Sequence, residues 1–205
     1  MYLTRPLRPF VMMSILGTLA FCVGACEEEV AVPKPRTYPR VEYPAKAYKS
    51  FGEGYCAFTF DMPAYATVER DTTFFEKRPD SDCWFNLDVA ALNAKLYCSY
   101  YAIANRQRFD ELVQDAFAIT QKHNLRASYI EEVQVNRPTD RVYGVVFNVE
   151  GPAASSYQFF LTDSTQHFLR GALYFNTQSR PDSLRPVITF MREDMKQLVE
   201  TLRWR

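Results

Sequence analysis

The chain has 205 residues, and its 24 lysines and arginines balance 24 aspartates and glutamates, with both signs interleaved along the sequence. Nucleic-acid binding needs a basic face that neutralises phosphates, so this composition disfavours that function. Aromatic residues make up 15% of the chain against only 7 glycines, which excludes a low-complexity chain and favours a packed globular body.

Residues 1–25 are predicted to be a lipoprotein signal peptide. Arg5 and Arg8 precede an apolar run that is shorter than the roughly 20 residues of a membrane-spanning helix. Val23-Gly24-Ala25-Cys26 then has the small residues and the lipid-accepting cysteine of a lipobox. We therefore expect Cys26 to be lipidated and to hold the mature chain on a membrane of the bacterial cell envelope. The alternative is an ordinary secretory signal that is cleaved near Ala25.

Residues 26–50 are predicted to be a tether between this anchor and one globular domain, residues 51–205. Pro33, Pro35, Pro39 and Pro44 favour an extended, polyproline-like backbone that rises about 3.1 Å per residue. Glu27–Glu29 fit either a solvated linker or a signal that sorts the lipoprotein between membranes.

The first half of the globular domain is predicted to contain three or four antiparallel strands. Residues 55–69 and 83–101 are rich in aromatic and β-branched side chains, and turn-forming residues 78–82 separate them. From residue 106 to 123 the apolar positions recur every three or four residues, which predicts an amphipathic helix that Asn105 caps.

The second half is predicted to contain strands over residues 130–136, 141–150, 155–162 and 167–176, with a polar hairpin turn at 163–166. Residues 141–150 carry apolar side chains on both faces, so we expect this strand to be central. A second helix should begin after Pro181, with Asp182 or Ser183 as its N-cap and Pro186 in its first turn. Its apolar face is predicted to contain Leu184, Ile188, Met191, Met195, Leu198 and Leu202. The fold class is therefore α+β, with an antiparallel sheet of about six to eight strands packed against two amphipathic helices.

Three cysteines besides Cys26 remain in the mature chain, which allows one disulfide and one spare thiol. Cys56 and Cys83 each precede a predicted strand, so neighbouring strands could bring them together, and Cys98 would then stay unpaired. A structural role is favoured over a redox role because no Cys-x-x-Cys spacing occurs.

Asp163, Ser164 and His167 have the residue types of a serine-hydrolase triad. However, triads draw their members from separate elements, and neither a nucleophile elbow nor a glycine-rich oxyanion loop is present. A polar hairpin turn explains the same residues. The histidine spacing also gives no metal motif, so we expect no metal or cofactor. Arg170 precedes Gly171 inside a strand, where the glycine would let a partner's backbone approach. The alternative to contact with a partner is that Arg170 is simply an exposed residue of the strand.

The chain closely resembles the GldD type of gliding motility-associated lipoproteins. Matching positions are densest between residues 151 and 175 and near Cys83-Trp84. They include Pro33–Arg36, Tyr38, Arg40, Cys56, Pro63–Ala66, Asn86, Gly151, Ala153–Ser155, Gln158-Phe159, Thr162–Ser164, His167-Phe168, Gly171 and Leu173–Phe175. Phe85 and Cys98 depart from the pattern, where tyrosine and a small polar residue are expected. Because Cys56 and Cys83 both match, the resemblance strengthens their pairing.

The resemblance implies a lipid-anchored, noncatalytic accessory protein of gliding motility and its associated secretion machinery. It implies partners among the other envelope lipoproteins of that machinery, no small-molecule substrate and a domain that faces the periplasm. Contact through Thr162, Asp163, His167 and Arg170 is the corresponding prediction for the site. The competing hypothesis is an envelope small-ligand-binding protein or hydrolase that uses Asp163, Ser164 and His167.

Overall fold

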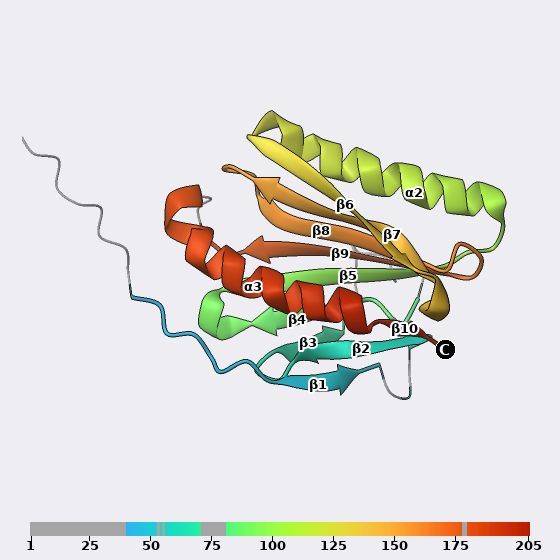
Figure 1. The fold of residues 1–205 in the computed structure, drawn as a ribbon, viewed down its shortest axis with the longest axis horizontal. Helices are drawn as coiled ribbons and strands as arrows, with labels where there is room; N and C mark the ends of the chain where they lie inside the picture. The colour runs from blue at the N-terminus through green and yellow to red at the C-terminus, as the bar shows by residue number, and fades with distance from the viewer. Residues whose placement is uncertain (1–39, 53, 55, 71–80, 178–179) are drawn as a thin grey trace, which may run out of the picture. The chain divides into compact units, whose positions relative to one another are not determined.

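A computed structural model of the chain describes residues 40–52, 54, 56–70, 81–177 and 180–205. The predicted signal peptide, Cys26, Glu27–Glu29 and the first three prolines of the tether lie outside these residues. The described part contains two α-helices, a seven-stranded antiparallel sheet and a three-stranded sheet (Figure 1). The predicted α+β class, with one large antiparallel sheet and two helices, is confirmed.

The large sheet has the strand order β3-β4-β5-β9-β8-β7-β6, and every neighbouring pair is antiparallel. Its strands are β3 (Thr67–Arg70), β4 (Phe85–Val89), β5 (Ala94–Ala102), β6 (Tyr129–Arg137), β7 (Val142–Glu150), β8 (Ser155–Thr162) and β9 (His167–Phe175). The middle strand is β9. Strand β7 is paired on both sides, with β8 and β6, so residues 141–150 form an interior strand, although not the middle one. Both faces of β7 are apolar because the sheet is covered on both sides even there.

A second sheet was not predicted from the sequence. It pairs β1 (Tyr48–Phe51) and β10 (Arg203–Trp204) with the two sides of β2 (Phe58–Pro63). Thr59 is opposite Arg203 and Phe58 is opposite Trp204, so residues near the two ends of the described chain meet in this sheet.

The first helix was predicted correctly, whereas the start of the second was not. Helix α2 (Arg106–Gln121) is capped by Asn105, whose side chain accepts a hydrogen bond from Arg108 N at 2.8 Å. Helix α3 (Pro181–Thr201) has Arg180 at its N-cap position, so Asp182 and Ser183 lie inside its first turn. Pro181 explains the difference, because proline favours the first helical position with its fixed φ and its missing N–H. Short 3₁₀ helices η1 (Ala90–Leu92), η2 (Lys122–Leu125) and η3 (Pro138–Asp140) complete the fold.

The two helices pack on opposite faces of the large sheet, as Figure 1 shows for α2 and α3. Leu112 and Ala116 of α2 contact Phe147, Phe160 and Phe168 in a small apolar cluster. The main core lies on the other face. There the helix α3 and the small sheet together cover the strands, and the core includes Met191, Met195 and Leu198 of α3, Phe58 and Phe60 of β2, and Phe85 and Leu96 of the large sheet.

The chain already packs on this body before β1 begins. Val41 packs against the main core, and the rings of Tyr43 and Phe190 lie 4.8 Å apart. Residues 41–50, which the sequence analysis placed in the tether, therefore contact the helix α3 or form part of the small sheet.

Candidate functional site

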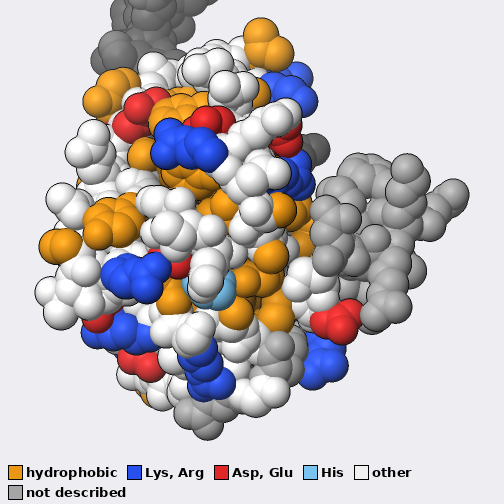
Figure 2. Space-filling model, turned by 90° about the vertical axis from the view of Figure 1, so that its right-hand side faces the viewer, with side chains coloured by type: hydrophobic (Ala, Val, Ile, Leu, Met, Phe, Trp, Pro, Cys, Tyr) orange, Lys and Arg blue, Asp and Glu red, His pale blue; other side chains and the backbone are white. Residues whose placement is uncertain are grey.

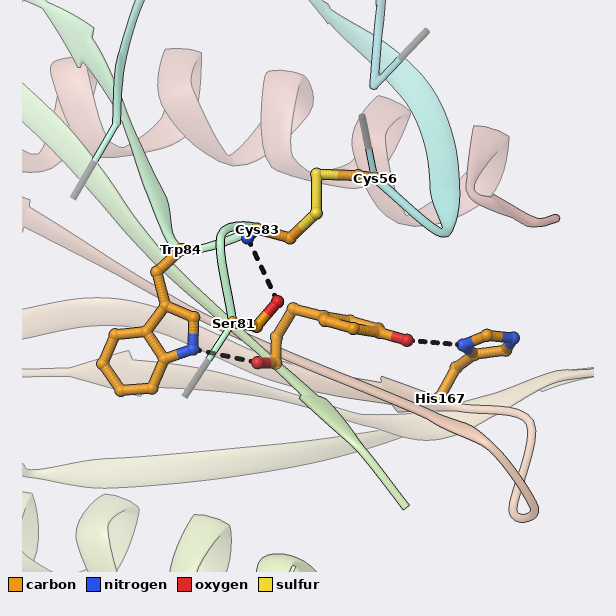
Figure 3. Close-up of a disulfide and its surroundings, with 6 residues drawn as sticks. Cys56, Ser81, Cys83, Trp84 and His167 are labelled. Carbon is orange, nitrogen blue, oxygen red and sulfur yellow. Dashed lines mark hydrogen bonds between the residues drawn. A yellow bond between two sulfur atoms is a disulfide. The ribbon is translucent and has the colours of Figure 1, made fainter. Parts of the chain in front are cut away.

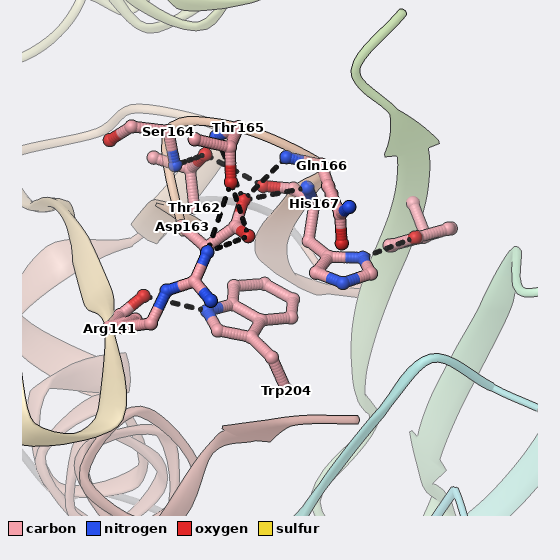
Figure 4. A network of polar contacts seen from close by, with 9 residues as sticks. Arg141, Thr162, Asp163, Ser164, Thr165, Gln166, His167 and Trp204 are labelled. Carbon is pink, nitrogen blue, oxygen red and sulfur yellow. Dashed lines mark hydrogen bonds and ion pairs between the residues drawn. The ribbon is translucent and has the colours of Figure 1, made fainter.

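The turn between β8 and β9 is held by the buried carboxylate of Asp163 (Figure 4). Its Oδ1 accepts hydrogen bonds from the backbone N–H groups of Thr165, Gln166 and His167 at 2.8–3.0 Å. Burial alone would raise the pKa of Asp163, but these N–H groups outweigh it and lower the pKa to about 2. The carboxylate also pairs with Arg141 at 3.2 Å. Its hydrogen-bonding capacity is therefore largely used inside the turn.

Thr162 and Ser164 belong to the same turn. Thr162 is buried, donates from Oγ1 to the carbonyl oxygen of His167 at 2.6 Å and accepts from Ser164 N at 2.9 Å. Ser164 is exposed and has a left-handed backbone with φ of 66°. This arrangement explains the preference for small polar residues at these positions, as the hairpin-turn interpretation predicted.

The side chain of His167 lies on the face of the sheet that carries the main core. Its Nδ1 is 2.7 Å from the hydroxyl of Tyr100. Its ring stacks on Trp204 (Figure 4). Trp204 Nε1 donates to the carbonyl oxygen of Arg141 at 3.0 Å. Burial lowers the pKa of His167, with a smaller effect of the same sign from Arg141 and an opposing one from Asp163.

The three residues of the hypothetical triad make separate contacts. Asp163 binds backbone N–H groups and Arg141, while the ring nitrogen of His167 bonds to Tyr100. In a serine-hydrolase triad the carboxylate orients the imidazole, and the imidazole takes the proton of the serine. These contacts instead favour a structural role for the turn.

Arg170 was predicted to act together with His167, but the structure places them on opposite faces of the large sheet. His167 and Leu169 face the main core, whereas Phe168 faces the helix α2 and Arg170 borders the groove described below. The proposed reason for Gly171 is also wrong. A Cβ atom on Gly171 would lie 2.3 Å from the ring of Phe159, so the space beside this glycine holds a core side chain of the same molecule.

The structure pairs Cys56 with Cys83, with their Cα atoms 5.6 Å apart (Figure 3). The two cysteines precede β2 and β4, which belong to different sheets. The disulfide therefore joins the two sheets, and the predicted pairing of the ends of two strands takes place between sheets. Cys98 is free and buried, and burial raises the pKa of its thiol.

Trp84 connects this disulfide to the opposite face of the sheet. It follows Cys83 directly, and its Nε1 donates to the carbonyl oxygen of Tyr100 at 2.9 Å. The indole packs edge-on against Tyr101, with ring centroids 5.3 Å apart. Trp84 is thus a fixed, buried side chain at one border of a groove.

This groove lies on the same face of the large sheet as the helix α2 and has a volume of about 1100 Å³. The strands β4, β5 and β9 form its floor, and Ile119 near the end of α2 and Lys122 at the start of η2 form one wall. The floor combines aromatic and charged side chains: Trp84, Asp88, Lys95, Tyr97, Tyr101, Arg170 and Tyr174. We call it the α2-side groove. Its aromatic and polar lining is typical of a binding site on a rigid scaffold.

Only Arg170 of this groove was predicted from the sequence. The alternation of Lys95, Tyr97, Ser99 and Tyr101 along β5 was a usable signal, because it puts polar and aromatic residues on one face of a strand whose other face is apolar. The helix α2 leaves this part of the sheet uncovered. This depends on tertiary packing, so no local sequence signal predicts it.

A second polar cluster was also missed. The carboxylate of Asp194 in α3 is fully buried, lies 2.7 Å from Lys46 Nζ and accepts hydrogen bonds from the hydroxyls of Tyr48 and Tyr65. Lys46 Nζ also lies 3.5 Å from the ring centroid of Phe190. Burial, followed by Asp194, raises the pKa of Tyr48 to about 12. This cluster fastens the segment before β1 to α3, and an acid at an otherwise apolar helix position was its sequence signal.

The remaining surface gives little indication of what the protein binds. Figure 2 shows basic and acidic side chains interspersed on one face. Within the described residues no group of three His, Cys, Asp or Glu side chains is placed to hold a metal ion. None of the helices described there combines the length and apolarity that a membrane crossing requires.

Comparison with known proteins identifies one matching family. The model of the family described as gliding motility lipoprotein GldD matches residues 28–204. No curated protein matches the chain. Among solved structures, the solution structure of cyanobacterial PsbP (CyanoP) from Synechocystis sp. PCC 6803 superposes with a TM-score of 0.44 at 8% identity. That superposition covers 79% of this chain and 95% of the cyanobacterial chain.

Proposed function

Because this chain belongs to the family of gliding motility lipoprotein GldD, we propose that it is a noncatalytic accessory protein of the gliding and associated secretion machinery. It acts by binding another envelope lipoprotein of that machinery through the α2-side groove. Its lipid anchor keeps the groove at the membrane where this partner is found.

The anchoring part of the proposal rests on Cys26 and the residues that follow it. Two acyl chains on this cysteine would suffice for stable attachment, at about 0.8 kcal/mol per buried methylene. The proline-rich residues before Arg40 would span a few tens of ångströms if extended, at about 3.1 Å per residue. The domain would then face the periplasm, a compartment that permits a disulfide such as Cys56–Cys83.

The α2-side groove is the observation that carries the binding part of the proposal. Tyr97 on its floor is 46% exposed although it lies within a nine-residue strand in the interior of the sheet. Tyrosine and tryptophan supply large contact areas at a low cost in side-chain entropy, and both are enriched at protein interfaces. Because three paired strands hold these rings, a partner would meet a preformed surface.

The noncatalytic part is supported by the contacts of the hairpin turn. The side chains of Asp163 and His167, which a hydrolase would need for catalysis, bind the turn itself, Arg141 and Tyr100. The hydrolase alternative makes a simple prediction, namely that Ser164→Ala abolishes motility without lowering the amount of folded protein. Normal motility of that variant would support the accessory role.

Site-specific photo-crosslinking in motile cells tests the proposed function. A photoreactive phenylalanine analogue at Tyr97 should give one defined crosslinked envelope protein. The same analogue at Tyr129, an exposed tyrosine on the edge strand β6, serves as the matched control and should not give that product. In parallel, Tyr97→Ala should reduce both gliding and the abundance of the crosslinked partner. The proposal is wrong if Tyr97→Ala glides normally and the analogue at position 97 yields no specific product.

A further inference from the structure

Arg170 is held in the α2-side groove by a chain of buried hydrogen bonds. Its guanidinium donates to Gln158 Oε1 at 3.2 Å, and Thr120 Oγ1 lies 3.3 Å from the same oxygen and 3.0 Å from the carbonyl oxygen of Ala116, between which its one proton is shared. Gln158 and Thr120 are 1% and 3% exposed. Gln158 Nε2 has no hydrogen-bond partner among the described residues.

Such a buried polar chain is costly in an interface between a helix and a sheet. An unsatisfied buried amide lowers stability, and apolar side chains at these two positions would avoid that cost. The arrangement restrains one nitrogen of the Arg170 guanidinium at the groove. In functional sites, the residue that touches the ligand is commonly held in place by buried hydrogen bonds from the residues behind it.

The positive charge of Arg170 is not matched inside the described part of the protein. Lys95, the other cation on the groove floor, pairs with Glu69 at 2.8 Å and with Asp88 at 3.4 Å. No carboxylate of the described residues lies within 4.0 Å of the Arg170 guanidinium, and Asp115 acts on it only at longer range. Arginine keeps its charge in proteins, so a partly buried cation is left for a ligand to neutralise.

Aromatic rings border this cation on both sides along the groove. Tyr97 and Tyr174 pack edge-on with centroids 5.6 Å apart, and Trp84 and Tyr101 form a similar pair. Arg170 lies opposite Ser99 in the pairing of β5 with β9, between Tyr97 and Tyr101. The groove thus presents the exposed ring of Tyr97, with Tyr174 beside it, next to the guanidinium of Arg170.

We propose that the α2-side groove binds an extended peptide segment of the partner protein, in which one Asp or Glu carboxylate pairs with Arg170 and a neighbouring apolar residue packs on the rings of Tyr97 and Tyr174. This inference rests on the proposed function and adds the chemistry of the partner. The planar fork of arginine matches a carboxylate with two parallel hydrogen bonds.

Two cations line the groove besides the ion-paired Lys95, namely Arg170 on the floor and Lys122 on the wall. Both attract a negatively charged ligand. Asp88 on the same floor would repel a doubly charged phosphate more than a singly charged carboxylate. His123 does not add to the positive charge, because burial and the charge of Arg170 both lower its pKa.

A displayed library of random peptides tests the inference on the purified, detergent-solubilised lipoprotein. Peptides that bind the native protein should be enriched in Asp or Glu with aromatic or large apolar residues within three positions. Replacement of that acid by Asn or Gln should weaken binding at least tenfold, and Arg170→Gln should have the same effect. Arg170→Lys should recover part of the loss, because it keeps the charge without the planar fork. Arg185→Gln, on the exposed surface of α3, is the charge-matched control and should bind normally.

The two histidines supply a readout inside the folded protein. Neutralisation of Arg170 by a bound acidic peptide removes a cause that lowers the pKa of His123, so that pKa should rise by NMR titration. The pKa of His167 on the other face should not change. Peptides that bind without an enriched acid, or with equal affinity to Arg170→Gln, would overturn the carboxylate inference while leaving the Tyr97 crosslink intact. Loss of that crosslink and of all peptide binding would instead remove the proposed function itself.

Discussion

The ring of His167 stacks on the indole of Trp204, with centroids 5.2 Å apart and ring planes inclined by 14°. This contact joins β9, in the middle of the large sheet, to β10 of the small sheet. The hydrogen bond from Trp204 to the carbonyl oxygen of Arg141 extends it to the start of β7. A residue that resembled a catalytic base in the sequence is thus a link between two sheets.

Stability should depend on pH through His167. Because burial lowers its pKa in the folded protein, the unfolded chain binds more protons than the folded one just below pH 6.5. The stabilising effect is therefore complete above about pH 6.5 and is lost as the pH falls towards the folded pKa. Denaturant unfolding between pH 7.5 and 5.5 should show a smaller decrease in stability for His167→Gln than for the native protein. An unchanged slope in that variant would contradict this role.

The disulfide should protect two of the cysteines from alkylation. Under denaturing, nonreducing conditions we expect Cys98 to be modified while Cys56 and Cys83 are not, by mass analysis of the mature protein. Native protein should leave Cys98 unmodified as well, since its side chain is buried. Replacing Cys56 and Cys83 together by alanine should cost about 3 kcal/mol, because it frees a loop of 27 residues in sequence separation. Alkylation of Cys56 without reduction would show that the pair is wrong.

Removal of the carboxylate of Asp194 should destabilise the fold strongly. Asp194→Asn leaves the partly buried ammonium of Lys46 without its closest counter-ion, which should cost about 3 kcal/mol in chemical denaturation. Glu193→Gln is the matched control, because Glu193 is 64% exposed and lies 3.7 Å from the same ammonium. That change should stay within about 0.5 kcal/mol. Equal effects of the two variants would show that the buried cluster adds nothing specific.

A methyl group on Gly171 should be poorly tolerated. The Cβ of Gly171→Ala would overlap the ring of Phe159, and overpacking of this kind costs about 1–3 kcal/mol. Phe159→Leu removes the obstructing ring atoms, so the double variant should be less destabilised than the sum of the two single changes. Thermal unfolding of the four proteins measures this coupling, and strict additivity would refute the explanation.

Lipidation at Cys26 should be lost when its thiol is removed. Metabolic labelling with an alkyne fatty acid is expected to mark the native protein and not Cys26→Ser. Cys98→Ser should keep the label and serves as the control. Label retained on Cys26→Ser would exclude this cysteine as the anchor.

Local signals in the sequence predicted much of the secondary structure. Helix α2 has both its N-cap residue and its 3.6-residue apolar period in the local sequence, and residues 163–166 hold the hairpin of β8 and β9 mainly through hydrogen bonds within the turn. The small sheet was missed because β10 has two residues and β1 follows a proline-rich segment, so only pairing with β2 defines them. The two apolar faces of β7 indicated an interior strand correctly, but they could not give its place in the strand order.

The candidate site was less accessible to sequence reasoning. The alternation of side chains along a strand places His167 and Arg170 on opposite faces of the sheet, because they are three residues apart. The groove depends on where α2 stops covering the sheet, and the support of Arg170 comes from Gln158 and Thr120 in two other elements. These contacts are set by packing between segments that are distant in the sequence.

The pairing of β2 with β10 also constrains the order in which the protein can fold. The backbone N–H of Asp61 donates to Thr201, 140 residues further along the chain, and closing a loop of that length is slow relative to local folding. A chain that leaves a translocation channel with its N-terminus first cannot complete its small sheet until residues 203–204 have emerged. Until then the phenylalanines of β2 are exposed to other unfolded chains, so a chaperone that holds unfolded chains would be most useful to this protein before its last residues are available.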